Sequence, residues 1–187
     1  MIKIGPPRIK ALARPGVTTY GEVGDDGGRD QVVQIFIAHD QDSIISLQLL
    51  YDENGKLVLS DRHGGDGAPK LDVVTLNYPL EYITGIKGCY NREVTRSRKG
   101  KTLYCHDRVV SITFITNNRT YGPFGGGGTK QDEGVADDSI FQYQLGPNRQ
   151  FGGLHGRAGK ILHALGVYAK PLTALSNVKV KVENEIA

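Results

Sequence analysis

The chain has 187 residues and a formal charge of +3 at pH 7, so it is long enough for one domain with a real hydrophobic core, and its charge alone gives no argument for nucleic-acid binding. It has no apolar run near the roughly 18 residues that a membrane helix needs. The first 21 residues also lack the long apolar stretch of a secretory signal, so we expect a cytoplasmic or nuclear protein.

Two cysteines, Cys89 and Cys105, are present and do not form a metal-binding CxxC pair. We expect reduced thiols, with a single disulfide left open as the alternative. The five histidines are scattered, so the sequence predicts no zinc site and no other cofactor. It contains no GxSxG motif and no supported pair of carboxylates, so we expect no catalytic residues.

In chain order, residues 1–16 are basic and interrupted by proline, which predicts an N-terminal tail; the alternative is that Ile2, Lys3 and Ile4 add to a sheet edge. A first strand is expected at 17–20, followed by a glycine loop at 21–28. Apolar, β-branched segments at 32–38 and 44–51 predict two strands, and Asn54-Gly55 predicts a hairpin turn between the second of them and 57–59.

A second glycine loop follows at 63–67, and further strands are expected at 72–78, 82–87, 109–115, 119–124, 140–145, 151–155 and 161–170. The polar, basic segment 91–101 is expected to be a solvated loop; contact with phosphates of lipid or nucleic acid is its weaker alternative. Residues 172–187 are expected to be a C-terminal tail. About a dozen short strands and no sustained helical period predict an all-β Greek-key domain at 17–171.

Several motifs occur in one order along the chain: GDDGG at 24–28, HGG at 63–65, NYPLEYITGIKG at 77–88, SITF at 111–114, YGPFG at 121–125 and FGGLHGRAGKILHALGVYAKP at 151–171. Together they resemble the jacalin-related lectins of plants. This resemblance implies a β-prism I fold, with three four-stranded Greek-key sheets around a pseudo-threefold axis. It also implies a lectin, of the kind associated with defence or stress responses.

The resemblance also implies where a sugar would bind. The family joins its first glycine loop to a GxxxD loop late in the chain, and a third loop completes the site. The corresponding residues here are Gly27 and Gly28 in the first loop, Gly159, Lys160, Ile161, Leu162 and His163 in the late loop, and His106 and Asp107 in the third. Lys160 and Ile161 would offer backbone amides to sugar hydroxyls.

His163 is a departure from the family pattern, because it stands where the family has aspartate. A carboxylate accepts two hydroxyls, whereas a neutral imidazole has one donor and one acceptor. The change would cost roughly 1.5–3 kcal/mol of hydrogen bonding. The chain also keeps its residues ahead of Gly27, which favours the mannose/glucose type over the galactose type.

These observations leave two functions open. The first is a non-catalytic lectin that binds mannose/glucose-type glycans or glycoproteins, strengthened by homo-oligomers. The second is a module of the same fold that has lost sugar binding and docks a protein partner. Nucleic acid is not expected as a partner, and no membrane span is expected.

Overall fold

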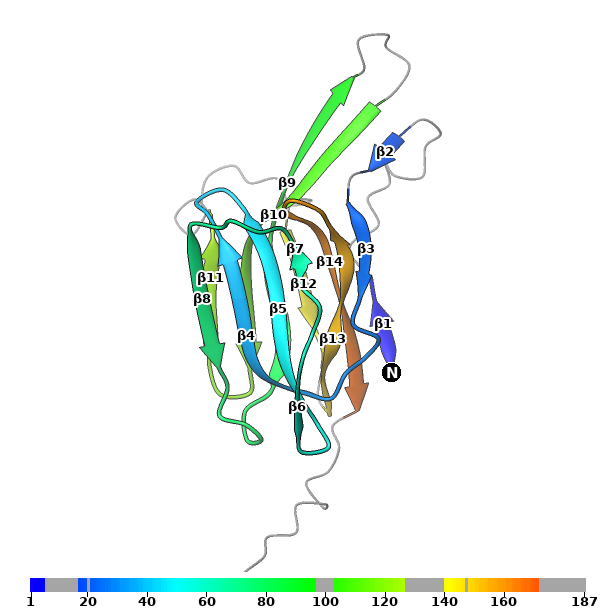
Figure 1. The fold of residues 1–187 in the computed structure, drawn as a ribbon. Coiled ribbons are helices and arrows are strands. Elements are labelled where there is room, and N and C mark those ends of the chain that lie inside the picture. The colour runs from blue at the N-terminus through cyan, green and yellow to red at the C-terminus, as the bar shows by residue number, and fades with distance from the viewer. Residues whose placement is uncertain (6–16, 20, 97–102, 127–139, 147, 172–187) are drawn as a thin grey trace, which may run out of the picture.

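The computed structural model describes residues 1–5, 17–19, 21–96, 103–126, 140–146 and 148–171, with the backbone alone at 17–19, 92–96 and 103–106. Three sheets form a prism (Figure 1). The predicted all-β fold is confirmed. None of the described residues forms a helix that could cross a bilayer.

Each sheet has a path of four neighbouring strands, and two of the sheets carry one extra strand. Sheet A has the order β1 (Ile2–Ile4), β14 (Leu162–Pro171), β13 (Arg149–Ala158), β3 (Glu22–Asp25). Sheet B has the order β11 (Thr120–Gly125), β10 (Leu103–Thr116), β9 (Ile83–Arg96), β12 (Ile140–Gln144), and β2 (Val17–Thr19) also pairs with β10. Sheet C has the order β6 (Lys56–Leu59), β5 (Ile44–Glu53), β4 (Gln31–His39), β8 (Lys70–Thr75), and β7 (His63–Gly64) also pairs with β5.

One hydrophobic core fills the space between the sheets, and alternation along the strands supplies it. Phe141 and Tyr143 of β12 are buried while Ile140, Gln142 and Gln144 are exposed, as the period of two predicts. Sheet C contributes fully buried side chains from β4 and β5, and sheet B contributes Phe114. The predicted hairpin turn is confirmed: Asn54 and Gly55 have φ of 58° and 84°, the left-handed values that this turn needs.

The N-terminal segment departs from the expected tail. Ile2–Ile4 is a strand that pairs antiparallel with β14, which was the alternative. The rest of the expected N-terminal tail, residues 6–16, and the expected C-terminal tail, residues 172–187, lie outside the described part of the chain. Val17–Thr19 is a strand as expected, but it pairs parallel with β10.

The basic segment also differs from the prediction, because β9 continues to Arg96 and β10 begins at Leu103. Residues 91–96 are therefore strand and not loop. The two cysteines lie on these neighbouring strands, but Cys89 is opposite Ser111 and Cys105 is opposite Val94. Five residues of strand separate Cys89 from Val94, about 16 Å, so a disulfide between the two cysteines within one chain is excluded.

Candidate functional site

The late loop connects β13 to β14 and is the centre of the candidate site. Gly159 and Lys160 are exposed, Ile161 is half-buried, and the Gly159 amide donates to the Ile161 carbonyl at 3.0 Å. The amides of Lys160 and Ile161 donate to no other described residue. Two backbone donors are therefore presented together at one turn. Leu162, expected in the site, is instead 1% exposed and belongs to the core.

His163 is held by a single well-defined contact. Its Nδ1 lies 2.7 Å from the Asp107 carbonyl oxygen. A carbonyl can only accept, so Nδ1 carries the hydrogen, and Nε2 of the neutral ring keeps a lone pair. Nε2 lies on the Gly159 side of the ring, where a Cβ placed on Gly159 would be 3.4 Å away. The ring therefore presents one acceptor toward Gly159, the residue before the two free amides.

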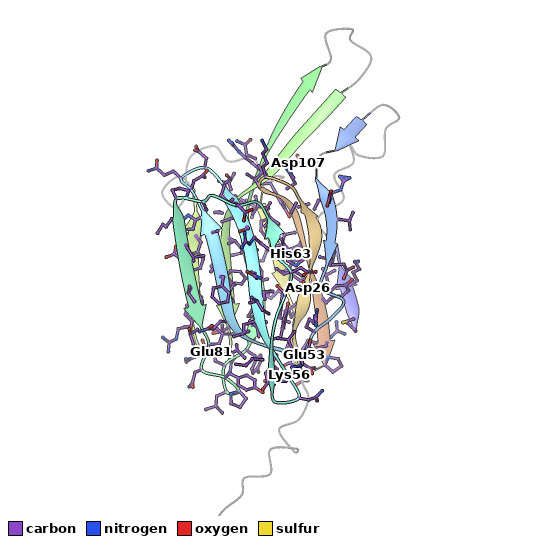
Figure 2. The ribbon with its side chains drawn as sticks, viewed as in Figure 1. Asp26, Glu53, Lys56, His63, Glu81 and Asp107 are labelled. Carbon is purple, nitrogen blue, oxygen red and sulfur yellow. The ribbon has the colours of Figure 1, made fainter. Side chains whose placement is uncertain are left out.

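β10 lies along a third side of the candidate site, where Asp107 contacts His163. Asp107 contributes its backbone carbonyl to His163. His106 lies beside it in β10 with its backbone opposite Glu93. Figure 2 shows Asp107 at one end of the prism, far from Lys56 at the other end. The third loop of the prediction is thus an ordered strand at the site's edge.

Two tyrosines fix the position of β14 behind this site. The hydroxyls of Tyr90 and Tyr143 both donate to the Leu165 carbonyl, at 3.2 and 2.6 Å. Burial raises the pKa of Tyr90 to about 12, and burial also raises the pKa of Tyr143. Both phenols therefore stay neutral donors, and they hold β14 of sheet A against β9 and β12 of sheet B.

The first glycine loop does not contribute as expected. β3 runs antiparallel to β13, with Glu22 opposite Ala158 and Asp25 opposite His155. The residue before β3 therefore meets the late loop, and the residues after β3 lie at its far end. Gly28 is packed against the Met1 side chain and near the Gly152 carbonyl. Gly27 and Gly28 are thus outside the site.

Gly21 takes the place that Gly28 was expected to hold. Its φ is +93°, and a Cβ there would lie 2.8 Å from His163 Cδ2 and 2.9 Å from the Ala158 carbonyl oxygen. Only glycine allows both this conformation and this approach. The register of the folded sheet shows this, because Glu22 opposite Ala158 puts Gly21 beside Gly159.

Asp40 lies in the turn between β4 and β5, near the second glycine loop. Burial would raise the pKa of Asp40, but hydrogen bonds from the Asp42 and Ser43 amides, both 2.7 Å, hold it below its usual range. Its carboxylate therefore serves its own turn. Gly65 lies against the Lys160 backbone and so supports the late loop.

In the part of the chain that the structure describes, no group of His, Cys, Asp or Glu could hold a metal ion.

Comparison with known proteins agrees with this architecture. A family model described as "Jacalin-like lectin domain" matches residues 15–168. The Arabidopsis thaliana protein "RESTRICTED TEV MOVEMENT 1" is 40% identical over 95% of this chain and 91% of its own, and "Jacalin-related lectin 2" of the same plant is 32% identical over 91% and 86%.

Among solved structures, the artocarpin–mannotriose complex is 25% identical, with a TM-score of 0.64 over 91% of this chain and 95% of its own. Single-chain jacalin is 24% identical, with a TM-score of 0.66 over 90% and 93%, and shows the fold alone. The order of motifs, the β-prism I architecture and these matches together show that the chain belongs to the jacalin-like lectin family.

Proposed function

We propose that the protein is a non-catalytic lectin that binds mannose- or glucose-type glycans at the late loop. The observation that carries this proposal is the pair of free amides at Lys160 and Ile161 beside the acceptor Nε2 of His163. A hexose rim offers adjacent hydroxyls, each of which both donates and accepts a hydrogen bond. The two amides serve as donors to it and Nε2 as the acceptor, with Gly21 leaving room for the ring.

The solved complex of artocarpin with mannotriose supports the choice of sugar, and another relative of known structure, 25% identical, is described as a mannose-binding lectin. Binding here is weaker than in a site with a carboxylate, because a neutral nitrogen accepts one hydroxyl where two oxygens accept two. The difference is about 1.5–3 kcal/mol, or about tenfold to hundredfold in affinity. Several copies in one assembly would compensate through avidity.

The test is a calorimetric titration of mannotriose into the wild type and two variants. His163→Asp restores the carboxylate, and we expect a gain in affinity of about tenfold or more. Lys160→Pro removes one amide, and we expect loss of binding in a protein whose thermal unfolding shows that it is folded. Gln142→Glu adds a carboxylate at an exposed position of β12 and serves as the control, with no gain. A folded His163→Asp variant that binds no better than the wild type would refute the proposal.

A protein-docking module is the second candidate, and the outer face of sheet C favours it. Four apolar side chains stand out on this face: Leu57 is 60% exposed, Leu59 51%, Leu71 62% and Val73 49%. An open groove of about 260 Å³ lies between this face and the segment from Arg62 to Ala68. Leu57 and Leu59 lie on the edge strand β6, and Leu71 and Val73 lie on the opposite edge strand β8. Exposed apolar side chains are common at interaction surfaces.

A glycan array distinguishes the two candidates. A defined mannoside signal that His163→Asp strengthens supports the lectin. A blank array, together with a partner whose capture is lost in Leu71→Ser/Val73→Ser but kept in Gln142→Glu, supports the docking module.

A further inference from the structure

The two faces of β3 can be told apart from the contacts of two adjacent residues. A Cβ on Gly24 would lie 2.6 Å from His63 Nδ1 of sheet C, so Gly24 faces the interior of the prism. Asp25 faces outward, where its carboxylate pairs with Lys3 at 2.7 Å. Because successive side chains of a strand alternate, Val23 shares the outward face with Asp25.

Val23 is the residue of this face that lies nearest to the candidate sugar site with its side chain in solvent. It is 79% exposed. Gly21, two residues earlier, approaches His163, since a Cβ there would lie 2.8 Å from His163 Cδ2. Leu162 points into the core, so His163, the next residue, points outward. Two strand residues span at most about 7 Å, so Val23 is about one sugar ring away from the His163 site.

Arg157 and Ala164 complete a row across the sheet with Val23. Arg157 of β13 is directly opposite Val23, and Ala164 of β14 is directly opposite Arg157. Directly opposite residues point to the same face, with their Cβ atoms about 5 Å apart. The row therefore presents a valine side chain beside a half-buried guanidinium group.

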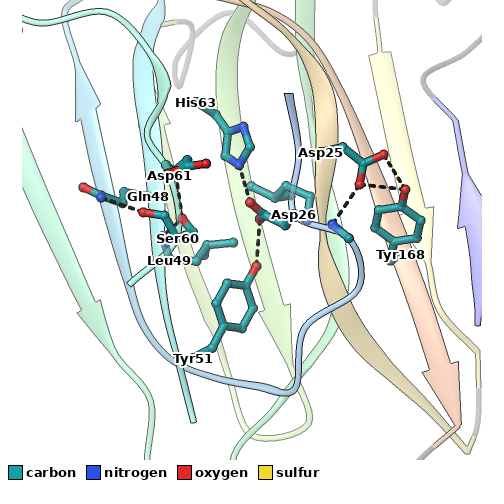
Figure 3. A network of polar contacts seen from close by, with 11 residues as sticks. Asp25, Asp26, Gln48, Leu49, Tyr51, Ser60, Asp61, His63 and Tyr168 are labelled. Atoms are coloured by element: carbon teal, nitrogen blue, oxygen red, sulfur yellow. Dashed lines mark hydrogen bonds and ion pairs between the residues drawn. The ribbon is translucent and has the colours of Figure 1, made fainter. Parts of the chain in front are cut away.

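The next row closes this surface. Asp25 is directly opposite His155, and its carboxylate accepts hydrogen bonds from Lys3 at 2.7 Å and from the Tyr168 hydroxyl at 2.6 Å (Figure 3). The Lys3 amine also lies 5.1 Å from the centre of the Tyr168 ring. These groups are used within the protein. One row, that of Val23, thus separates the sugar site from the closed part of the face.

We propose that the protein recognises a linear oligosaccharide and not a single sugar, with the first unit at the late loop and the second on the Val23 row. A pyranose has an apolar C–H face and a rim of hydroxyls. Val23 packs against the C–H face, and Arg157 donates to the hydroxyls, since a guanidinium has five N–H donors in a fixed plane. This inference rests on the proposed function, because it uses the same loop for the first unit.

The test is the ratio of the affinities for mannotriose and for methyl mannoside, measured by calorimetry. We expect the wild type to bind mannotriose about fivefold to tenfold more tightly, because the second unit adds one hydrogen bond and one apolar contact. Val23→Ser and Arg157→Gln should each reduce this ratio about twofold to fivefold. Ile140→Ser on sheet B and Arg149→Gln at the far end of β13 are the matched controls and should keep the wild-type ratio.

The ratio separates contact with the second unit from a structural effect, because a distorted late loop would weaken binding of both sugars alike. A wild-type ratio of about three or less, which three equivalent mannose units produce by number alone, overturns the inference and leaves the proposed function in place. A wild-type ratio in both folded variants also overturns it. If Arg157→Gln does not fold, Val23→Ser decides alone. If neither sugar binds the folded wild type or His163→Asp, both proposals fail.

Discussion

Gly21 shows how a single residue controls the candidate site. Its φ of +93° and its contact with the His163 ring leave no space for a side chain. Gly27 also has a positive φ, +66°, but a Cβ there would meet nothing within 4 Å. The two glycines therefore have similar backbone demands and different surroundings.

We expect Gly21→Ala to destabilise the fold by about 1–3 kcal/mol and to abolish mannotriose binding, because the new methyl group displaces His163. Gly27→Ala should cost about 1–2 kcal/mol of backbone strain and leave binding intact. Urea unfolding and calorimetry on both variants measure these effects. Equal losses of affinity would contradict the assignment of Gly21, and not Gly27, to the site.

At the scale of a single strand, a buried histidine stabilises the position of β1 at the edge of sheet A. His155 is 7% exposed, and its Nε2 lies 2.9 Å from the Ile4 carbonyl, to which it donates. Burial lowers the pKa of His155 below its usual range. Lys3 of the same strand pairs with Asp25 at 2.7 Å, and this contact, with those from Tyr168 and Gly27, holds the pKa of Asp25 well below its usual range.

These shifts predict an acid-sensitive edge strand. The folded state favours the neutral form of His155. Below the unfolded-state pKa of about 6.5, the unfolded chain therefore binds more protons than the folded chain, and the stability of the folded state falls as the pH drops. The Asp25 contribution is present above about pH 4 and is lost only at lower pH.

The free energy of unfolding should therefore decrease between pH 7.5 and 5.5, and His155→Gln should show a smaller decrease over the same range. Arg29→Met removes the pair with Glu53 without touching β1 and should keep the wild-type pH dependence. Urea titrations at several pH values measure all three proteins. An unchanged pH dependence in His155→Gln would exclude His155 as its source.

At the scale of the whole molecule, one buried carboxylate joins two sheets (Figure 3). Asp26 accepts hydrogen bonds from His63 Nε2 at 2.6 Å and from the Tyr51 hydroxyl at 2.9 Å, both from sheet C. It also accepts from the Leu154 amide of sheet A at 3.2 Å. Burial and the neighbouring carboxylate raise the pKa of Tyr51 well above its usual range, so the phenol remains a donor.

Asp26→Ala should lower the free energy of unfolding by about 3–5 kcal/mol, because it leaves a buried hydroxyl and a buried imidazole without their acceptor. Asp25→Ala removes the half-exposed pair with Lys3 and the hydrogen bonds from Tyr168 and Gly27, and should cost less, about 1–2 kcal/mol. Chemical denaturation of the two variants provides the comparison. Similar losses for both would show that the network does not hold the sheets together.

Much of this architecture could be predicted from short-range patterns. Alternation identified the buried face of β12, and Asn54-Gly55 identified the β5–β6 turn, because both depend on a few adjacent residues. The late loop and the exchange of aspartate for His163 were also visible as motifs. The free amides of Lys160 and Ile161 follow from the same local turn.

The class of fold, most of the strands and the loop that presents the candidate site can therefore be read from the amino-acid sequence. The folded arrangement was needed to show that Gly21 and not Gly28 faces His163, that Asp26 is buried while Asp25 is paired at the surface, and that β2 joins a long β9–β10 hairpin. This division arises because a strand's period and a turn's conformation are encoded locally. Which residues of two distant strands meet depends on their register, which the packing of the whole prism sets.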